Sequence, residues 1–403
     1  MSFLSFFRNE KEEVSLLIDI GNGSIGAAFV LFGQSTPKIL YAIRLPLVIV
    51  ENLDSKTLSQ GMETLLDETI GAIVKKGFEM DFWKKKSKKI SSVLVSFSSP
   101  WFVEKTKDIH ISEEKSFVIT RKFLESILQK EEESFQEELS KNSGGGSESS
   151  FVVIEESIVR TEINGYVLND SLGKKTKTFD LTISFAVLSK NIAEKINGII
   201  IKHTHTSLAQ IKMHTFPFIS FIVLRDIFPN ISDFLIMDIT AEIVEITLVA
   251  EGVIVNTVSF PCGKNSIIRH VSKAFNSSPE VAMSHFHLYT ENKVDLATQQ
   301  KMQSVLADIE KEWAIYLEDA LTGLSSEMHL PSRIYITADS DILPLFIDFI
   351  KLPKTDSTGN FRKNVEVVEV NHGLLSHLYQ DNASIEDQFI AILSIFYNKI
   401  IKQ

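Results

Sequence analysis

Cysteine is nearly absent from this sequence, because Cys262 is the single example among 403 residues. One cysteine excludes an intramolecular disulfide framework and every zinc site that needs several thiolates, and this fits a reducing cytoplasm. The chain also lacks an apolar run long enough to cross a bilayer, since the strongest candidate, residues 216–224, is interrupted by Pro217 and Ser220. We predict that this run is a buried helix.

An excess of basic charge is missing as well. The 41 basic residues are outnumbered by 52 acidic ones, which gives a formal net charge of −11. A general nucleic-acid binder carries the opposite sign, so we expect no nucleic-acid partner. The first residues lack the basic leader and the small-residue cleavage site of a secretion signal. The apolar side chains of residues 1–7 instead predict a weak peripheral contact with a membrane surface.

Two glycines lie in a short bend between two apolar strands near the start of the chain. Residues 15–30 contain an apolar strand that ends at Asp19, then a bend and a second apolar strand. The bend contains Gly21, Asn22, Gly23 and Ser24. Because glycine permits backbone angles that other residues avoid, consecutive amide groups can converge there on an anion such as phosphate. In a P-loop or a dinucleotide fingerprint the bend leads into a helix, so both of those folds are disfavoured.

A second hairpin repeats this architecture. Residues 234–249 again read as an apolar strand, an acid (Asp238), a short bend and a second strand, and they are the one internal echo of the chain. Between the two hairpins, residues 112–205 read as helix, strand, strand and helix. This order predicts an inserted α+β subdomain.

The other elements follow from hydrophobic spacing. Helices are expected over residues 58–74, 120–140, 192–200, 265–275, 296–324, 343–350 and 384–401. Strands are expected over residues 39–50, 93–97, 152–159, 179–188, 253–260, 333–337 and 365–370. Pro46 places the first of these strands at a sheet edge, and residues 140–150, with three consecutive glycines, are predicted to form a mobile linker. The last helix has an apolar stripe that suits a core or a membrane surface, and we favour the core.

The two acid-tipped hairpins resemble the phosphate hairpins of the actin-like superfamily, in the bacterial branch that contains the division protein FtsA and the pilus protein PilM. The sequence DIGNGS (residues 19–24) resembles the first hairpin, and DITAEIVEIT (residues 238–247) resembles the second. YITADSDILPLF (residues 335–346) resembles the adenosine-side strand, turn and helix. SSVLVSFSS (residues 91–99) and INGYVLNDSLGKK (residues 163–175) resemble parts of the small inserted subdomain of FtsA and the segment leading into it.

This resemblance implies an α/β fold with duplicated actin-like halves around a central cleft and an inserted small α+β subdomain that is SHS2-like. The first half would span residues 1–111 and the second half residues 206–403. The inserted subdomain would be residues 112–205.

The resemblance also implies a site for ATP and Mg²⁺ in the cleft. Asp19 and Asp238 would lie around the metal, and hard cations do prefer such oxygen ligands. The phosphates would contact the two bends, and the base would lie near the adenosine turn. The residues implied in nucleotide binding are Asp19, Gly21, Asn22, Gly23, Ser24, Asp238, Thr240, Ala338 and Asp339.

Several positions depart from the pattern of the family. Thr240 replaces a glycine after the second acid, and residues 338–339 replace the glycine pair of the adenosine turn. Ala282 and His285 stand where an acid and a lysine usually lie beside the ribose. Glu242 would place a carboxylate near phosphate, which is repulsive unless a metal intervenes. A nucleotide clamp and a nucleotide-independent scaffold therefore both remain open, with at most weak ATPase activity and no covalent catalysis expected.

Two roles follow from the resemblance. One is an FtsA-like cytoplasmic scaffold that recruits a partner, such as an FtsZ-like protein, at the inner face of the membrane in cell division. The alternative is a PilM-like adaptor that binds the cytoplasmic tail of a membrane protein in type IV pilus or secretion assembly. Either role allows self-association into dimers or filaments. An active kinase-like or chaperone-like ATPase is less favoured because both turns are altered.

Overall fold

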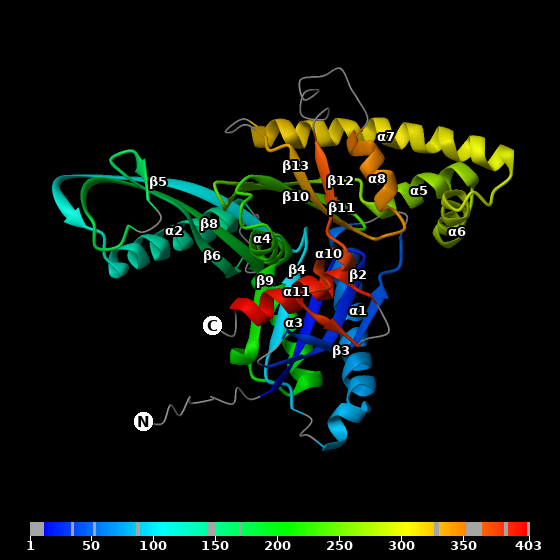
Figure 1. The fold of residues 1–403 in the computed structure, drawn as a ribbon, viewed down its shortest axis with the longest axis horizontal. Helices are drawn as coiled ribbons and strands as arrows, with labels where there is room; N and C mark the ends of the chain where they lie inside the picture. The colour runs from blue at the N-terminus through cyan, green and yellow to red at the C-terminus, as the bar shows by residue number, and fades with distance from the viewer. Residues whose placement is uncertain are drawn as a thin grey trace, which may run out of the picture.

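The computed structural model describes residues 12–33, 36–50, 54–85, 89–142, 150–168, 171–325, 330–351, 365–382 and 386–400. These residues form three sheets, with six, five and four strands, and helices that cover them (Figure 1). The predicted membrane contact of residues 1–7 and most of the predicted linker at residues 140–150 lie outside the described residues. Two short 3₁₀ helices are η1 (Asp81–Lys85) and η2 (Leu208–Gln210).

The first sheet contains the first predicted hairpin. Its strands are β1 (Glu13–Ile20), β2 (Ser24–Phe32), β3 (Lys38–Pro46), β4 (Val93–Phe97), β9 (Ile211–Thr215) and β15 (Gln380–Asp381), in the order β15-β3-β2-β1-β4-β9. β1 and β2 pair in antiparallel fashion, and β4 runs parallel to β1. The predicted edge position of β3 is wrong at its start, because β15 pairs with Lys38 and Ile39. Helix α1 (Ser55–Gly77) packs on this sheet through an apolar face that includes Met62 and Leu66.

The second sheet repeats the first. It consists of β10 (Phe234–Ile239), β11 (Ile243–Ala250), β12 (Val253–Pro261), β13 (Arg333–Ala338) and β14 (Glu366–Glu369). Its order β12-β11-β10-β13-β14 matches β3-β2-β1-β4-β9, including the antiparallel hairpin and the parallel strand beside its first member. The duplication predicted from the two hairpins is therefore confirmed.

Four helices cover the second sheet. They are α5 (Lys264–Phe275), α6 (Pro279–Thr290), α7 (Leu296–Ser325) and α8 (Leu343–Lys351). Their shared core is centred on Trp313 of α7, which is 1% exposed and lies 5.7 Å, between ring centroids, from both Phe346 and Phe349 of α8.

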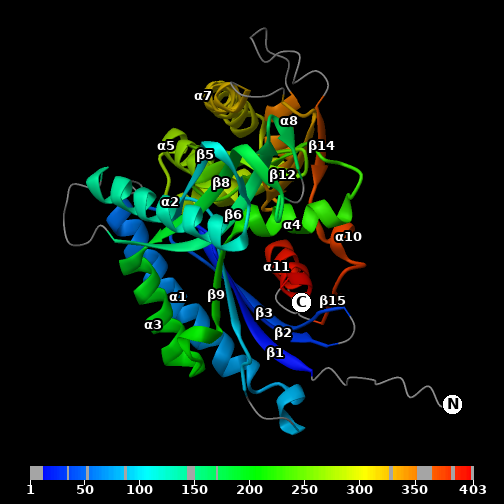
Figure 2. The same ribbon diagram turned by 90° about the vertical axis from the view of Figure 1, so that its left-hand side faces the viewer.

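The third sheet contains the strands of the predicted inserted unit. It consists of β5 (Phe102–Val118), β6 (Phe151–Ile163), β7 (Tyr166–Val167) and β8 (Lys175–Ser189), in the order β5-β8-β6-β7. Helix α2 (Arg121–Asn142) packs on this sheet. The boundary predicted between residues 111 and 112 falls inside β5. Helix α3 (Lys190–Thr204), predicted to complete the inserted unit, lies along α1 of the first half (Figure 2).

Helices α4 (Phe216–Ile227) and α11 (Gln388–Ile400) lie between the first two sheets (Figure 2). α4 is buried over most of its length, as predicted. In α11, Ile390, Leu393 and Phe396 are fully buried against both sheets, so the interpretation of this helix as part of the core is confirmed. The short helix α10 (His372–Leu375) precedes it. Among the described residues, no helix has the length and apolar character of a membrane span.

Candidate functional site

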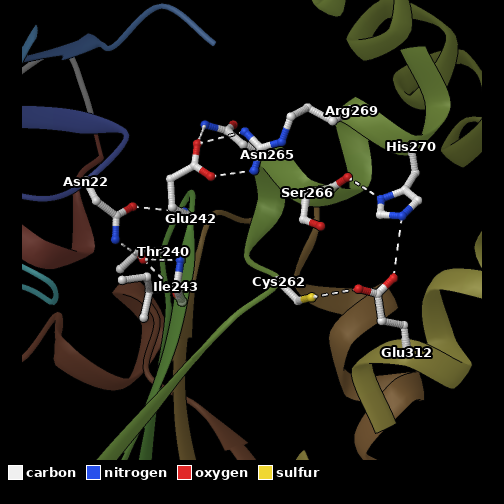
Figure 3. A network of polar contacts seen from close by, with 10 residues as sticks. All are labelled: Asn22, Thr240, Glu242, Ile243, Cys262, Asn265, Ser266, Arg269, His270 and Glu312. Atoms are coloured by element: carbon white, nitrogen blue, oxygen red, sulfur yellow. Dashed lines mark hydrogen bonds and ion pairs between the residues drawn. The ribbon is translucent and has the colours of Figure 1, made fainter. Parts of the chain in front are cut away.

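The turns of the two hairpins lie directly against each other, and Asn22 joins them (Figure 3). Asn22 Nδ2 donates to Thr240 Oγ1 at 2.7 Å, while Asn22 Oδ1 accepts from the Glu242 backbone amide at 2.9 Å. The second hydrogen of Nδ2 is donated to the Ser99 carbonyl at 2.7 Å. Asn22 is 1% exposed, so these bonds form away from water. One side chain therefore satisfies its polar groups by bridging both halves of the fold.

Gly23 allows the turns to approach this closely. A Cβ atom built on Gly23 would lie 1.9 Å from the Cβ of Ala241, which no real side chain could tolerate. Thr240 closes its own turn, because its hydroxyl donates to the Ile243 carbonyl at 2.7 Å. Where Gly23 meets Ala241, the two turns are therefore in direct contact.

A second connection is made by Arg44, which lies on β3. Its Nη2 donates to Asp19 Oδ2 at 2.9 Å, and its Nη1 donates to Ser24 Oγ at 3.0 Å. Its Nε and Nη2 also donate to the two carboxylate oxygens of Asp387, at 2.7 and 3.0 Å. The guanidinium lies 5.0 Å from the ring centroid of Phe389, a cation–π distance. Asp19 and Asp387 are 2% and 8% exposed, so Arg44 compensates two buried carboxylates.

Asp387 and Gln388 extend this connection to the second half. Asp387 Oδ1 accepts from the Ile390 amide at 3.1 Å, and a carboxylate in this position stabilises the start of α11. Gln388 Nε2 donates to the carbonyl of Ala338 at 2.6 Å. The start of α11 thus contacts both the first hairpin, through Arg44, and the turn predicted to lie near a base.

The acids Asp238 and Glu245 are buried near the meeting point of the hairpins. Asp238 Oδ1 accepts from Thr337 Oγ1 at 2.7 Å, and Glu245 Oε1 accepts from Ser99 Oγ at 2.6 Å. Burial raises the pKa of Asp238 to about 7; the Thr337 hydroxyl opposes this increase and the negative charge of Asp19 adds to it. Burial likewise raises the pKa of Glu245 to about 8. Burial also raises the pKa of Asp19, against the effect of Arg44.

Glu242, the carboxylate expected near phosphate, is bound by helix α5 (Figure 3). Arg269 donates to both of its carboxylate oxygens, at 3.1 and 2.5 Å, and Asn265 Nδ2 donates to Oε1 at 2.8 Å. Nearby, Lys264 Nζ lies 2.9 Å from carboxylate oxygens of both Asp339 and Asp341. The charged groups of this side of the cleft are therefore paired within the chain.

Cys262 lies on the segment just before α5, near Glu312 (Figure 3). Its thiol donates to Glu312 Oε1 at 3.9 Å, and Glu312 Oε2 is 3.5 Å from His270 Nε2. Burial, together with the charge of Glu312, raises the pKa of the Cys262 thiol to about 11. Because the thiolate is the nucleophilic form of cysteine, this environment does not activate Cys262.

Two hollows lie beside the hairpins. The first is a cavity of about 210 Å³ between the turns, less than the range of about 300–1,000 Å³ that is usual for ligand pockets. The second has about 580 Å³ and shares Arg44, Lys264, Asp339 and Phe389 with the first. Its other charged lining residues are acidic apart from His372. A polyphosphate would meet mostly like charge there.

The strand order and the paired hairpins can be compared with solved structures. The chain is similar to the PilM-PilN type IV pilus biogenesis complex, with a TM-score of 0.57 and 13% identity over 95% of this chain and 97% of that chain. The chain has the actin-like fold.

Two further solved structures are similar to the chain with lower TM-scores. A Bacteroides thetaiotaomicron protein described as having an actin-like ATPase fold and unknown function gives a TM-score of 0.42 and 11% identity, over 98% of this chain and 99% of that chain. The ethanolamine utilization protein EutJ from Carboxydothermus hydrogenoformans gives 0.41 and 11%, over 95% and 89%. No protein-family model and no curated protein sequence matches the chain.

Most of the predicted site residues come together in this actin-like fold. Asp19, Gly21, Asn22, Gly23, Ser24, Thr240 and Asp339 line the cavity of about 210 Å³. Asp238 and Ala338 are 2% and 1% exposed and are not among its lining residues. On α6, Ala282 is buried in the core, and Met283 is the residue that lines the cavity.

Sequence reasoning missed Arg44, Lys264 and Asp387. A signal for Arg44 was present, because it is the one charged residue in the apolar stretch at residues 39–50. Its partner Asp387 could not be predicted, since the two residues are 343 positions apart.

The residues of the cleft do not fit a magnesium–triphosphate group between the hairpins. Such a group would have to break the bonds of Asn22 to the second turn and separate Gly23 from Ala241. Arg44 already compensates one oxygen of Asp19. Asp19 Oδ1 and Asp238 Oδ2 are buried without a hydrogen-bond partner, but the described part of the chain contains no group of three or more acidic, histidine or cysteine residues that could hold a metal. The expected ATP and Mg²⁺ remain a prediction that this geometry does not favour.

Proposed function

We propose that this chain is an actin-fold adaptor that binds a protein partner and works without ATP turnover. The observation that carries this proposal is the direct contact of the two hairpin turns through Asn22. In a nucleotide clamp the phosphates would separate these turns. In this chain, Asn22 joins the two turns directly, and Arg44 compensates the charge of Asp19.

The partner that we propose is the cytoplasmic tail of a membrane protein in a type IV pilus or secretion apparatus. Support comes from the similarity to the PilM-PilN complex over 95% of the chain. For an FtsA-like division scaffold, the first role predicted from the sequence, α11 offers no membrane-binding face, because it is buried in the core. We therefore favour the adaptor role. We also propose that the inserted unit, predicted as residues 112–205, begins with β5.

We expect no saturable binding of ATP with magnesium, up to millimolar nucleotide. The measurement is a titration of labelled ATP into the full chain and into the variants Asp19→Ala and Asp308→Ala. Asp308 is an exposed acid on α7 and serves as the matched control. The three proteins should give the same flat titration, with folding checked by circular dichroism. Saturable binding by the unmodified chain that is lost in Asp19→Ala alone would contradict the proposal.

We expect a tail peptide to bind saturably in the absence of nucleotide. The peptides to test are the cytoplasmic tails of the membrane proteins encoded beside this gene, with scrambled versions as controls. Addition of ATP and magnesium should leave the Kd unchanged, because the hairpins are already in contact. The adaptor role would be overturned if none of the tails bound, or if binding required ATP.

A further inference from the structure

We infer that the chain's own side chains form a latch in the cleft. In this latch, Arg44 takes the place of a metal cation, and Asn22 supplies the bridge between the halves that a bound nucleotide would provide. The latch would hold the two halves closed with neither nucleotide nor divalent metal. This inference goes beyond the proposed role, because it concerns how the halves are joined and holds whichever partner is bound.

The first arm of the latch is Asn22. It bonds to Ser99, which follows β4 in the first half, and to the second turn at Thr240 and Glu242. All three contacts are 2.9 Å or shorter, and the side chain is buried. An amide that is buried and fully bonded on both sides of an interface is costly to separate, because each group would have to find a new partner.

The second arm runs through Arg44. Its guanidinium bonds to Asp19 and Ser24 of the first hairpin and to Asp387 at the start of α11. The next residue, Gln388, bonds to the end of β13 in the second half. This arm is therefore continuous from one hairpin, through the start of α11, to the opposite half.

Helix α5 connects the latch to the rest of the second half. The amides of Lys264 and Asn265 donate to the carbonyls of Thr240 and Ala241 at 3.1 and 2.7 Å. Together with the pairing of Glu242 and Arg269, these bonds fix α5 to the second turn. Asn22 thus positions α5 as well as the turn. A ligand shifts an equilibrium between two states only by the difference in its affinity for them, so a ligand that binds the open and closed halves equally well could not open the latch.

Spin-label distance measurements test the latch. Labels at Lys56 of α1 and Glu280 of α6, both exposed, report on the two halves in a Cys262→Ser background. We expect one distance population that is unchanged by a metal chelator or by ATP with magnesium. The Asn22→Ala variant should add a second population, and Asn191→Ala, an exposed site on α3, should not. A shift on adding ATP with magnesium, or identical populations in Asn22→Ala and the parent, would overturn the inference.

Hydrogen exchange gives an independent readout of the same bond. The Glu242 amide donates a hydrogen bond to Asn22 Oδ1 and should exchange about tenfold faster in Asn22→Ala. Unchanged exchange of the Glu242 amide in Asn22→Ala would contradict the latch. Failure of every tail peptide to bind, with these results intact, would overturn only the proposed function.

Discussion

Replacement of Arg44 by methionine is expected to lower the free energy of unfolding by about 3–5 kcal/mol. Arg44 contacts Asp19 and Asp387 at 2.9 and 2.7 Å, and both carboxylates are buried. Methionine has a similar length but no charge, so two carboxylates would remain in the interior without compensation. Breaking a buried ion pair by removing one partner is among the most destabilising single changes. Urea denaturation at neutral pH measures the effect.

Two variants control this experiment. Arg333 pairs with Glu366 at a more exposed position, so Arg333→Met should cost about 1 kcal/mol or less. Adding Asp19→Asn to Arg44→Met should recover part of the loss, because one of the unpaired charges is removed. The structural role of Arg44 would be refuted if its replacement cost no more than that of Arg333.

The features of the fold that depend on local sequence could be predicted. Each hairpin has an apolar strand, an acid and a bend that lie next to one another in the chain, so both hairpins were found. The duplication of the halves then followed from the repeated pattern. The buried helix α4 was recognised because its apolar run is too interrupted for a membrane span.

Strand β5 could not be predicted because its signal is weak. Over Phe102–Val118 most side chains are exposed or half-buried, and many are charged, so little apolar alternation marks one face. The strand exists because it pairs with β8 along most of its length. A partner about 70 positions away in the chain is not visible in a local pattern.

The candidate site shows a similar division. The predicted cleft residues converge, but the prediction assigned Asn22 to a phosphate-binding bend, whereas its side chain bridges the two turns. The role of the predicted cleft residues in nucleotide binding stays a prediction. Glu245 could have been flagged from the sequence, since it is the one charged residue of strand β11. Its position at the junction with Ser99 depends on the tertiary fold.

Glu245 is expected to make the protein less stable as the pH rises from about 4 to about 8. Burial raises the pKa of its carboxyl from 4.5 to about 8, so the folded state retains a proton that the unfolded state has lost. The stabilisation is complete below the ordinary pKa of glutamate and disappears as the pH approaches the folded value. Glu245→Gln keeps the shape without the titration, and it should raise stability at pH 8 by about 2–4 kcal/mol.

The measurement is urea denaturation across this pH range for Glu245→Gln and for Glu251→Gln, an exposed position in the turn directly after the same strand. Glu251→Gln should follow the parent curve. Asp238 and Glu104 face Glu245 from β10 and β5, and both have raised pKa values, so a smaller slope should persist in Glu245→Gln. Parallel curves for the two variants would show that the Glu245 carboxyl is ionised in the folded protein. The buried Glu245 carboxylate would then need a compensating cation in place of a proton.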